Sequence, residues 1–304
     1  QKHHTAAFRD VKEMGMVIHT FVHDLIPIVA PGTIDGTTCE IFYDWLVGTI
    51  EYTDHYLANS DATRTDLVRF LSSCGVDTDV KTVPLAQAGL PEPILEDTKD
   101  LQNANFQAGH LEAYPFFFET LNVSGTVRNI ASSPFILCVG TIESRKNCWR
   151  IAMAWKTLLD SGKNDLPQLV FAGRWGSLCA DFNNLMHATG NLYGYVNIVE
   201  APSDEELGVL YRHCEFLVMA STYEGWGLPV GEALAYGKTA VVSNGSSLPE
   251  VGGDLVEYCD PYSISSISDA MLRLWSDPHR RSELELKIRE AKLRSWLDVA
   301  HELY

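Results

Sequence analysis

Two glutamates, Glu224 and Glu232, flank a glycine-containing segment with the sequence Gly225-Trp226-Gly227-Leu228-Pro229. The apolar run over 215–220 predicts a buried strand before this segment, and Pro229 can occupy the first position of the helix that follows. A loop that leads into a helix N-terminus presents unpaired backbone N–H groups and the positive end of the helix dipole, so it favours an anion such as phosphate. Carboxylates accept hydrogen bonds from sugar hydroxyls. The stretch is therefore predicted to hold a sugar, a diphosphate and a ribose side by side.

Arg145 and Lys146 are the cations best placed to meet such an anion. They follow a strand predicted over 135–139 and the segment Gly140-Thr141-Ile142-Glu143. A Lys offers a compact positive charge to phosphate and an Arg a bidentate donor. The alternative is a solvated Arg-Lys pair at a loop tip. Gly173 and Arg174 directly follow the next predicted strand. Arg174 is a further candidate for contact with the base or the phosphate.

Alternating strands and helices must position these residues. From residue 135 onwards, strands are predicted over 135–139, 169–172, 196–199, 215–220 and 239–243, with helices between them and two more at the end. Ser203 and Glu206 form a capping box that opens one of these helices. The pattern is that of a doubly wound parallel α/β domain over 134–304. Residues 1–90 predict a strand-like apolar segment over 14–28, broken by His19, His23 and Asp24, then a helix over 37–53, a strand over 55–59, a helix over 60–73 and a strand over 80–86.

Between these two regions, residues 91–133 are expected to form an interdomain linker with some helix. The linker contains the aromatic run Tyr114-Pro115-Phe116-Phe117-Phe118, for which burial between the domains is the expected use. Asp77-Thr78-Asp79 has the spacing of a metal-binding DxD sequence, but it lies in a polar segment far from the other motifs and is expected to be a turn. No metal site is predicted.

Composition narrows the functional classes. The net charge of −17 and the pI near 4.9 argue against a nucleic-acid partner, because phosphate backbones require Lys/Arg surfaces. Seven cysteines, odd in number and without a CxxC pair, indicate buried thiols in a reducing compartment, so we expect a cytoplasmic protein. The sequence has no apolar run of membrane-spanning length and no recognisable signal peptide. It does not begin with Met, and we expect that it starts within a longer protein.

The string from Glu224 to Gly237 closely resembles the nucleotide-sugar site of retaining glycosyltransferases of family 4. The likeness covers two glutamates with seven residues between them, Gly-x-Gly-Leu-Pro within that interval and Glu-Ala-x-Ala-x-Gly from the second glutamate onwards. It implies a GT-B fold, in which two Rossmann-like domains face each other across a cleft. Residues 1–90 then correspond to the second half of the acceptor-side domain. The glycine-rich loop of its first half has no counterpart, so this domain is expected to be incomplete.

The resemblance also assigns roles on the donor side. Glu224 would contact the transferred sugar and Glu232 the ribose hydroxyls, while Gly225, Trp226 and the amides of Gly227 and Leu228 would lie along the diphosphate. Gly140 and Thr141 would form part of the same site. Many family members carry an additional Arg directly after the glycine, where this chain has Thr141. The phosphate charge would therefore rest on Lys146 and Arg145.

His23 begins the string His23-Asp24-Leu25-Ile26-Pro27 after the first predicted strand. In the family the matching histidine reaches across the cleft to the donor sugar, and the resemblance places His23 there. From the residues alone, His23 could instead only shape the end of the strand. His19, His3 and His4 have no motif around them, and Asp24 is expected to be an N-cap or a turn former.

The expected reaction is metal-independent transfer of a hexose with retention, most closely mannose from GDP-mannose, to a glycan or lipid-linked acceptor. The nucleotide sugar is a substrate that releases GDP or UDP, and no cofactor is expected. Peripheral contact with the inner face of a membrane and the oligomeric state are left open. The alternatives are a UDP-sugar donor, a non-catalytic nucleotide-sugar-binding subunit, or a glycosidase that uses Glu224 and Glu232. An NAD enzyme is disfavoured because no strand is followed by GxGxxG.

Overall fold

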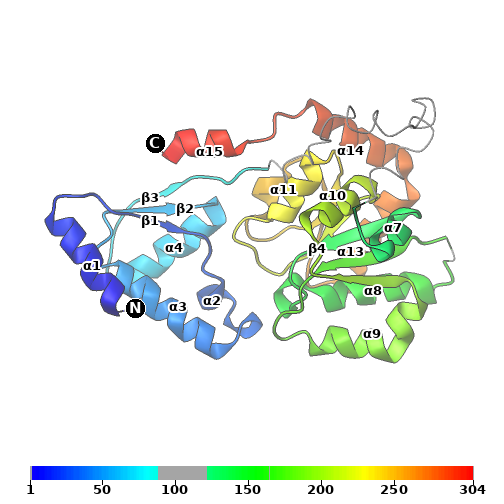
Figure 1. Cartoon of the computed structure of the whole chain (residues 1–304), viewed down its shortest axis with the longest axis horizontal. Helices are drawn as coiled ribbons and strands as arrows, with labels where there is room; N and C mark the ends of the chain where they lie inside the picture. Colours follow the sequence, from blue (N-terminus) through cyan, green and yellow to red (C-terminus); the bar gives the residue numbers. More distant parts are fainter. Residues whose placement is uncertain (1, 88–121, 164, 304) are drawn as a thin grey trace.

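The computed structural model describes residues 2–87, 122–163 and 165–303 of the 304-residue chain. Residues 91–121 of the expected linker, including the aromatic run Tyr114–Phe118, lie outside the described residues. The described part forms two α/β units, each built on a parallel sheet, as expected (Figure 1). None of the described helices is both long and apolar enough to cross a membrane.

The first unit contains a three-stranded parallel sheet in the order β1-β2-β3. Its elements, in chain order, are α1 (Lys2–Glu13), β1 (His19–Val22), α2 (Ile26–Val29), η1 (Pro31–Thr33), α3 (Gly36–Thr49), β2 (His55–Ala58), α4 (Asp61–Ser73) and β3 (Val80–Thr82). The predicted series of strand, helix, strand, helix and strand is confirmed. Asp35 and Ser60 cap α3 and α4, because each side chain accepts a hydrogen bond from a backbone N–H in the first turn of its helix.

The second unit contains a six-stranded parallel sheet in the order β6-β5-β4-β7-β8-β9. Its elements are α7 (Gly125–Ala131), β4 (Phe135–Val139), η3 (Ser144–Lys146), α8 (Cys148–Asp160), β5 (Gln168–Gly173), α9 (Ala180–Tyr193), β6 (Val196–Glu200), α10 (Asp204–His213), β7 (Leu217–Met219), α11 (Leu228–Ala235), β8 (Ala240–Ser243), α12 (Leu248–Gly252), β9 (Glu257–Cys259), α13 (Ile264–Ser276) and α14 (Pro278–Glu290). The chain winds outwards from β4 and then from β7, which is the doubly wound order. The predicted capping box at Ser203 is confirmed at the start of α10.

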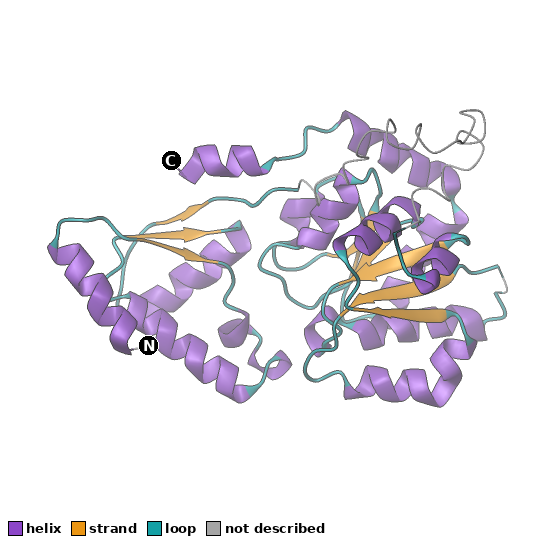
Figure 2. Ribbon diagram, in the orientation of Figure 1, coloured by secondary structure: helices purple, strands orange, loops and turns teal. Residues whose placement is uncertain are grey.

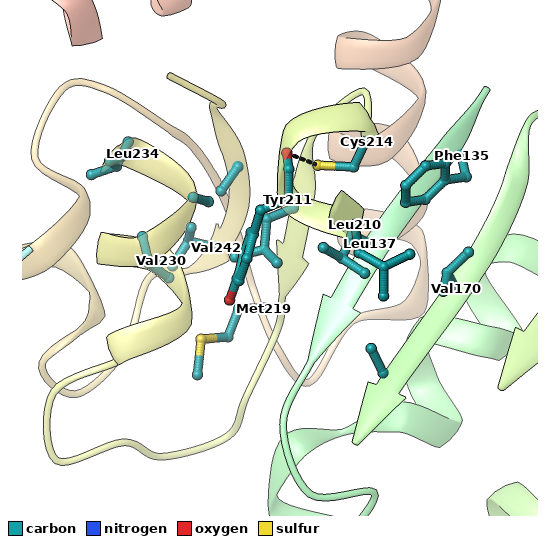
Figure 3. Close-up of a cluster of buried hydrophobic side chains, with 14 of the residues drawn as sticks. Phe135, Leu137, Val170, Leu210, Tyr211, Cys214, Met219, Val230, Leu234 and Val242 are labelled. Atoms are coloured by element: carbon teal, nitrogen blue, oxygen red, sulfur yellow. Dashed lines mark hydrogen bonds between the residues drawn. The ribbon is translucent and has the colours of Figure 1, made fainter. Parts of the chain in front are cut away.

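The sheet of the second unit is buried on both faces, as a parallel sheet covered by helices must be. Alternate residues of β4 enter different cores: Phe135 and Leu137 pack on one side, Ile136 and Cys138 on the other. Figure 3 shows the first of these cores, in which Tyr211 of α10 lies among apolar side chains of the strands and of α11. Because α7 also packs into this core through Val127, part of the expected linker belongs to the second unit.

Several local predictions were wrong or incomplete. Within 14–28 only His19–Val22 is a strand, and Ile26–Val29 forms the short helix α2 with a proline in its first turn. The expected strand over 80–86 ends at Thr82. The structure adds α1 and the edge strand β9, which the sequence analysis did not identify, and it supplies the bounds of α9, the helix between β5 and β6.

The two units meet at the carboxyl ends of their strands. In Figure 2 the strands of the two sheets point toward one another across the space between the units. The chain then returns: α15 (Trp296–Leu303) follows the second unit in sequence but lies beside β3 of the first (Figure 1). Its Val299 packs on Val83 and Ala86, and Lys81 Nζ donates to the carbonyl oxygen of Glu302 at 3.0 Å. The expected boundary of the second domain at 134–304 did not anticipate this return.

Candidate functional site

The site lies where the strand order reverses, between β4 and β7, which is where open α/β sheets bind ligands. The loop after β4 contains Gly140, Arg145 and Lys146, and the loop after β7 runs from Ala220 to Gly227. Two glycines allow the loops after β4 and β5 to touch: a Cβ on Gly173 would lie 2.0 Å from the carbonyl oxygen of Gly140. Gly140 itself has φ +130°, which disfavours any side chain there.

Asn147 fixes the loop that carries the two cations. It is buried in the left-handed conformation, and its Nδ2 donates to the carbonyl oxygens of Ala220 and Pro261 at 2.8 and 2.7 Å. The N–H of Thr222 donates to the carbonyl oxygen of Arg145 at 2.9 Å. These contacts join the cation loop to the loop after β7, so the charges of one face the carboxylate of the other.

The loop from Glu224 to Gly227 is held by hydrogen bonds to two serines that follow β8. Ser246 Oγ accepts a hydrogen bond from the N–H of Glu224 at 3.0 Å, and the buried Ser247 hydroxyl lies 3.0 and 2.9 Å from the carbonyl oxygens of Glu224 and Trp226. Gly227 has φ +111°, and α11 begins at Leu228, with Pro229 in its first turn. The amides that start α11 therefore face out of its N-terminal end, as predicted from the glycine and proline positions.

Glu224 forms ion pairs with both predicted cations. Its Oε2 lies 2.7 Å from Arg145 Nη1, and its Oε1 lies 2.8 Å from Lys146 Nζ. Arg145 Nη2 also lies 2.6 Å from Glu143 Oε1. The four side chains are 8–20% exposed, so the cluster is shielded from water and its charges sum to zero.

This arrangement fixes the charge states of the cluster. Burial alone would raise the pKa of Glu224, but Lys146 and Arg145 outweigh it and hold that pKa below its ordinary value. Burial likewise opposes the charge of Arg145, yet Glu224 and Glu143 raise its pKa. Glu224 is therefore a carboxylate at neutral pH, and the two cations that were expected to face phosphate are paired with it instead of pointing freely into solvent.

Glu232 lies one turn into α11 and is bound differently. Tyr211 of α10 donates a 2.6 Å hydrogen bond to its Oε2. Burial raises the pKa of Glu232, while the Tyr211 hydrogen bond and the nearby Lys146 act in the opposite direction. Lys146 thus acts electrostatically on both glutamates of the motif.

The first unit closes the site from the opposite side. His23 and Asp24, which follow β1, line a cavity of about 200 Å³ together with Arg145, Lys146 and Glu224. The loops pack closely there, because a Cβ on Gly225 would lie 2.3 Å from the carbonyl oxygen of His23. Lys146 also lines a smaller cavity of about 20 Å³ with Gly140 and Thr141. Lys146 therefore lies between the two cavities.

The predicted residues are placed unequally. The larger cavity brings together eight of them, which are His23, Arg145, Lys146, Glu224, Gly225, Trp226, Gly227 and Leu228. The ring of Trp226 belongs to the core, and its Nε1 donates to the carbonyl oxygen of Ala86 at 3.3 Å, so this residue also joins the two units. Gly173 packs against Gly140, whereas Arg174 is exposed and lines neither cavity.

Sequence reasoning missed several residues that shape the site. Asn59 lines the cavity and contacts His23, and Glu143 shares Arg145. The carboxylate of Glu250 accepts hydrogen bonds from the N–H groups of Asp61 and Ala62 at 2.7 and 2.9 Å, which ties α12 to the N-terminus of α4. Glu250 lies in the short helix α12. Among the residues that the structure describes, no three His, Cys, Asp or Glu side chains are grouped to hold a metal ion.

Comparison with known proteins identifies the family. Residues 127–292, more than half of the chain, match the family described as glycosyl transferases group 1. The chain belongs to this family. The match begins within α7 and includes the cation loop, the glutamate motif and α12, which carries Glu250.

This group 1 glycosyl transferase has relatives among bacterial mannosyltransferases. It is 33% identical to the O-antigen chain mannosyltransferase B of Escherichia coli over 168 residues, which cover 55% of this chain and 44% of that protein. It is 26% identical to the serotype-specific mannosyltransferase WbdA of Escherichia coli over 269 residues, or 86% of this chain and 31% of that protein. The chain thus spans less than half the length of these curated relatives.

The fold is shared with solved structures. The sucrose-phosphate synthase of Thermosynechococcus elongatus superimposes with a TM-score of 0.63 at 18% identity, covering 94% of this chain and 65% of that one. At this identity the likeness concerns the fold alone. The two parallel α/β units that face each other are those of GT-B glycosyltransferases, as the sequence analysis expected.

Proposed function

We propose that this chain transfers a hexose to a glycan or lipid-linked acceptor with retention of the anomeric configuration, and that the hexose is mannose supplied by GDP-mannose. The observation that carries the proposal is the buried cluster of Glu224, Arg145 and Lys146, which faces His23 across one cavity. The preference for mannose rests on the two Escherichia coli relatives, both of which are named as mannosyltransferases.

In the proposed reaction the bond between the anomeric carbon and the diphosphate oxygen breaks. The acceptor hydroxyl attacks from the same face, and its proton passes to the departing phosphate oxygen, so no nucleophile from the protein is required. Negative charge grows on the leaving diphosphate, and Lys146, Arg145 and the first amides of α11 would stabilise it. One well-placed donor of this kind is worth about 3–4 kcal/mol in a closed site. Glu224 and His23 would orient the sugar.

A glycosidase fits the site less well. Its general acid must hold a proton near neutral pH, but the two cations keep the pKa of Glu224 below its ordinary value. Glu232, the other carboxyl group of the motif, accepts the Tyr211 hydroxyl instead of facing Glu224 as a partner. The cluster is better suited to a leaving group with several negative charges.

The proposal is tested by binding and by turnover. Calorimetric titration of GDP and UDP into the chain tests the site and identifies the base, with tighter binding of GDP expected. Transfer from GDP-mannose should fall at least a hundredfold in Lys146→Ala, while Lys163→Ala, a substitution at an exposed loop position, should leave it unchanged. Near-normal turnover in Lys146→Ala with an intact fold would remove Lys146 from the mechanism. Nucleotide binding with neither donor hydrolysis nor transfer would favour a non-catalytic binding subunit.

A further inference from the structure

His23 and Asn59 are brought together by the register of the first sheet. β1 and β2 are parallel neighbours, with Val22 opposite Ala58, so the next residues of the two strands are adjacent where both strands end. Asn59 is 1% exposed, whereas His23 is exposed on the wall of the cavity shared with Glu224. A buried amide therefore lies behind an accessible imidazole.

The contact between them selects one form of the imidazole. Asn59 Nδ2 lies 3.0 Å from His23 Nδ1. An amide nitrogen can only donate, so Nδ1 must accept and carries no proton. A neutral imidazole has one N–H, which must then be on Nε2. The buried Oδ1 of Asn59 accepts no hydrogen bond from the described residues, so His23 is the contact that orients the amide.

Asn59 is itself held in place by its neighbours. It lies between the end of β2 and Ser60, the N-cap of α4, whose Oγ accepts a hydrogen bond from the N–H of Thr63 at 3.0 Å. Thr63 Oγ1 in turn donates to the carbonyl oxygen of Gly225 at 3.4 Å. The backbone that follows Asn59 is therefore tied to the glutamate loop as well as to the first sheet.

We propose that Asn59 is a positioning residue that keeps His23 in the Nε2–H form, so that the ring presents a donor to the ligand. The opposite wall of the cavity carries the Glu224 carboxylate, which only accepts. A hydroxyl group can accept from the one and donate to the other, so this pair suits a ligand that carries a hydroxyl group. The inference rests on the proposed function for the ligand being the donor sugar, but the form of the ring does not depend on it.

The form of the ring can be measured directly by NMR of the chain labelled with 15N-histidine. The His23 signals are assigned by their loss in His23→Gln. The unsubstituted protein should show a protonated Nε2 and an unprotonated Nδ1. Asn59→Ala should populate both neutral forms, and Asn59→Asp should invert the preference because a carboxylate only accepts. A protonated Nδ1 in the unsubstituted protein, or no change in either variant, would overturn the assignment.

Transfer assays then test whether the ring acts on the sugar. Asn59→Asp should lower kcat/KM for transfer by about 2- to 12-fold, the range for one neutral hydrogen bond. Asn129→Asp, at an exposed position of α7, adds the same charge and should leave kcat/KM unchanged. An inverted ring with a normal transfer rate would refute the role of His23 as a donor.

The two proposals can fail separately. If the ring behaves as expected but no nucleotide sugar is turned over by the unsubstituted chain, the proposed function fails and the pairing of Asn59 with His23 stands. If transfer occurs and the unsubstituted ring is protonated on Nδ1, the pairing fails and the proposed function stands. Should the Asn59 variants not fold, the ring of the unsubstituted protein alone decides.

Discussion

Replacing Glu224 with Gln should tighten the binding of GDP while it abolishes sugar transfer. In the structure the two cations that the diphosphate would use are already paired with Glu224, at 2.7 and 2.8 Å. A nucleotide must therefore share these cations with the carboxylate or displace it. Glutamine keeps the shape of the side chain and removes the competing charge. Transfer should fall because the sugar loses its carboxylate acceptor.

The expected magnitude follows from Coulomb's law. A phosphate bound to the same two cations would lie on the order of 5 Å from the carboxylate, and two like charges at that distance repel by roughly 3 kcal/mol at an effective dielectric constant of about 20. Because the cavity opens to solvent, about half of this value is a sounder expectation, and 1.4 kcal/mol corresponds to about tenfold in affinity. The gain should therefore be at least about tenfold.

Calorimetric titration of GDP at fixed ionic strength measures this change. Glu290→Gln, at an exposed position of α14, alters the net charge equally and should leave the affinity unchanged. Circular dichroism checks that Glu224→Gln is folded, because loss of one partner of a buried ion pair can cost about 3–5 kcal/mol. A folded Glu224→Gln variant that binds GDP no more tightly would show that Arg145 and Lys146 do not receive the diphosphate.

Three further predictions concern stability and can be read from urea unfolding. Gly225→Ala should destabilise the chain by about 1–3 kcal/mol, because its Cβ would lie 2.3 Å from the carbonyl oxygen of His23; Gly32→Ala, with open space around it, is the control. Glu250→Ala should cost about 1 kcal/mol through loss of the cap on α4, and an unchanged midpoint would show that the contact contributes nothing. Because the pKa of Glu224 is lowered in the folded state, the ionised carboxylate stabilises the fold above pH 4.5, the ordinary pKa of a glutamate, and this stabilisation is lost as the pH falls further. The difference in unfolding free energy between the unsubstituted protein and Glu224→Gln should therefore shrink in acid. A difference that stays constant with pH would contradict this sign.

The fold of the second unit could be predicted because its local signals agree with one another. The apolar run at 135–139 is β4 residue for residue, and the Ser203 capping box starts α10 as expected. The glycine, leucine and proline before Glu232 place a loop and a helix start at the end of β7. Each of these signals lies within a short stretch of sequence, so it can be recognised without knowledge of the tertiary contacts.

The missed features depend on contacts between distant residues. Asn59 meets His23 only because β1 and β2 pair in one register, and no local pattern around Asn59 indicates it. The return of α15 to the first unit is likewise set by tertiary packing through Val299. The error at Ile26–Val29 has a different cause: four apolar residues suit a strand as well as a helix, and the proline in the first turn decided the outcome.

The pairing of Lys146 and Arg145 with Glu224 also explains how an acidic chain can keep a cation site ready for use. Two buried cations without a counter-charge would be costly and would turn toward solvent or toward other carboxylates, of which this chain has many. Glu224 holds both cations in place before any ligand arrives. Glu143 forms a second ion pair with Arg145, which keeps Arg145 in position if Glu224 is displaced. Each negative charge that enters must compete with Glu224 for the two cations, so the site favours ligands that bring at least two negative charges. The ligand should also carry a hydroxyl group that can donate a hydrogen bond to the carboxylate. A nucleotide diphosphate sugar satisfies both conditions in one molecule, whereas inorganic phosphate offers no sugar hydroxyl and a neutral sugar offers no charge.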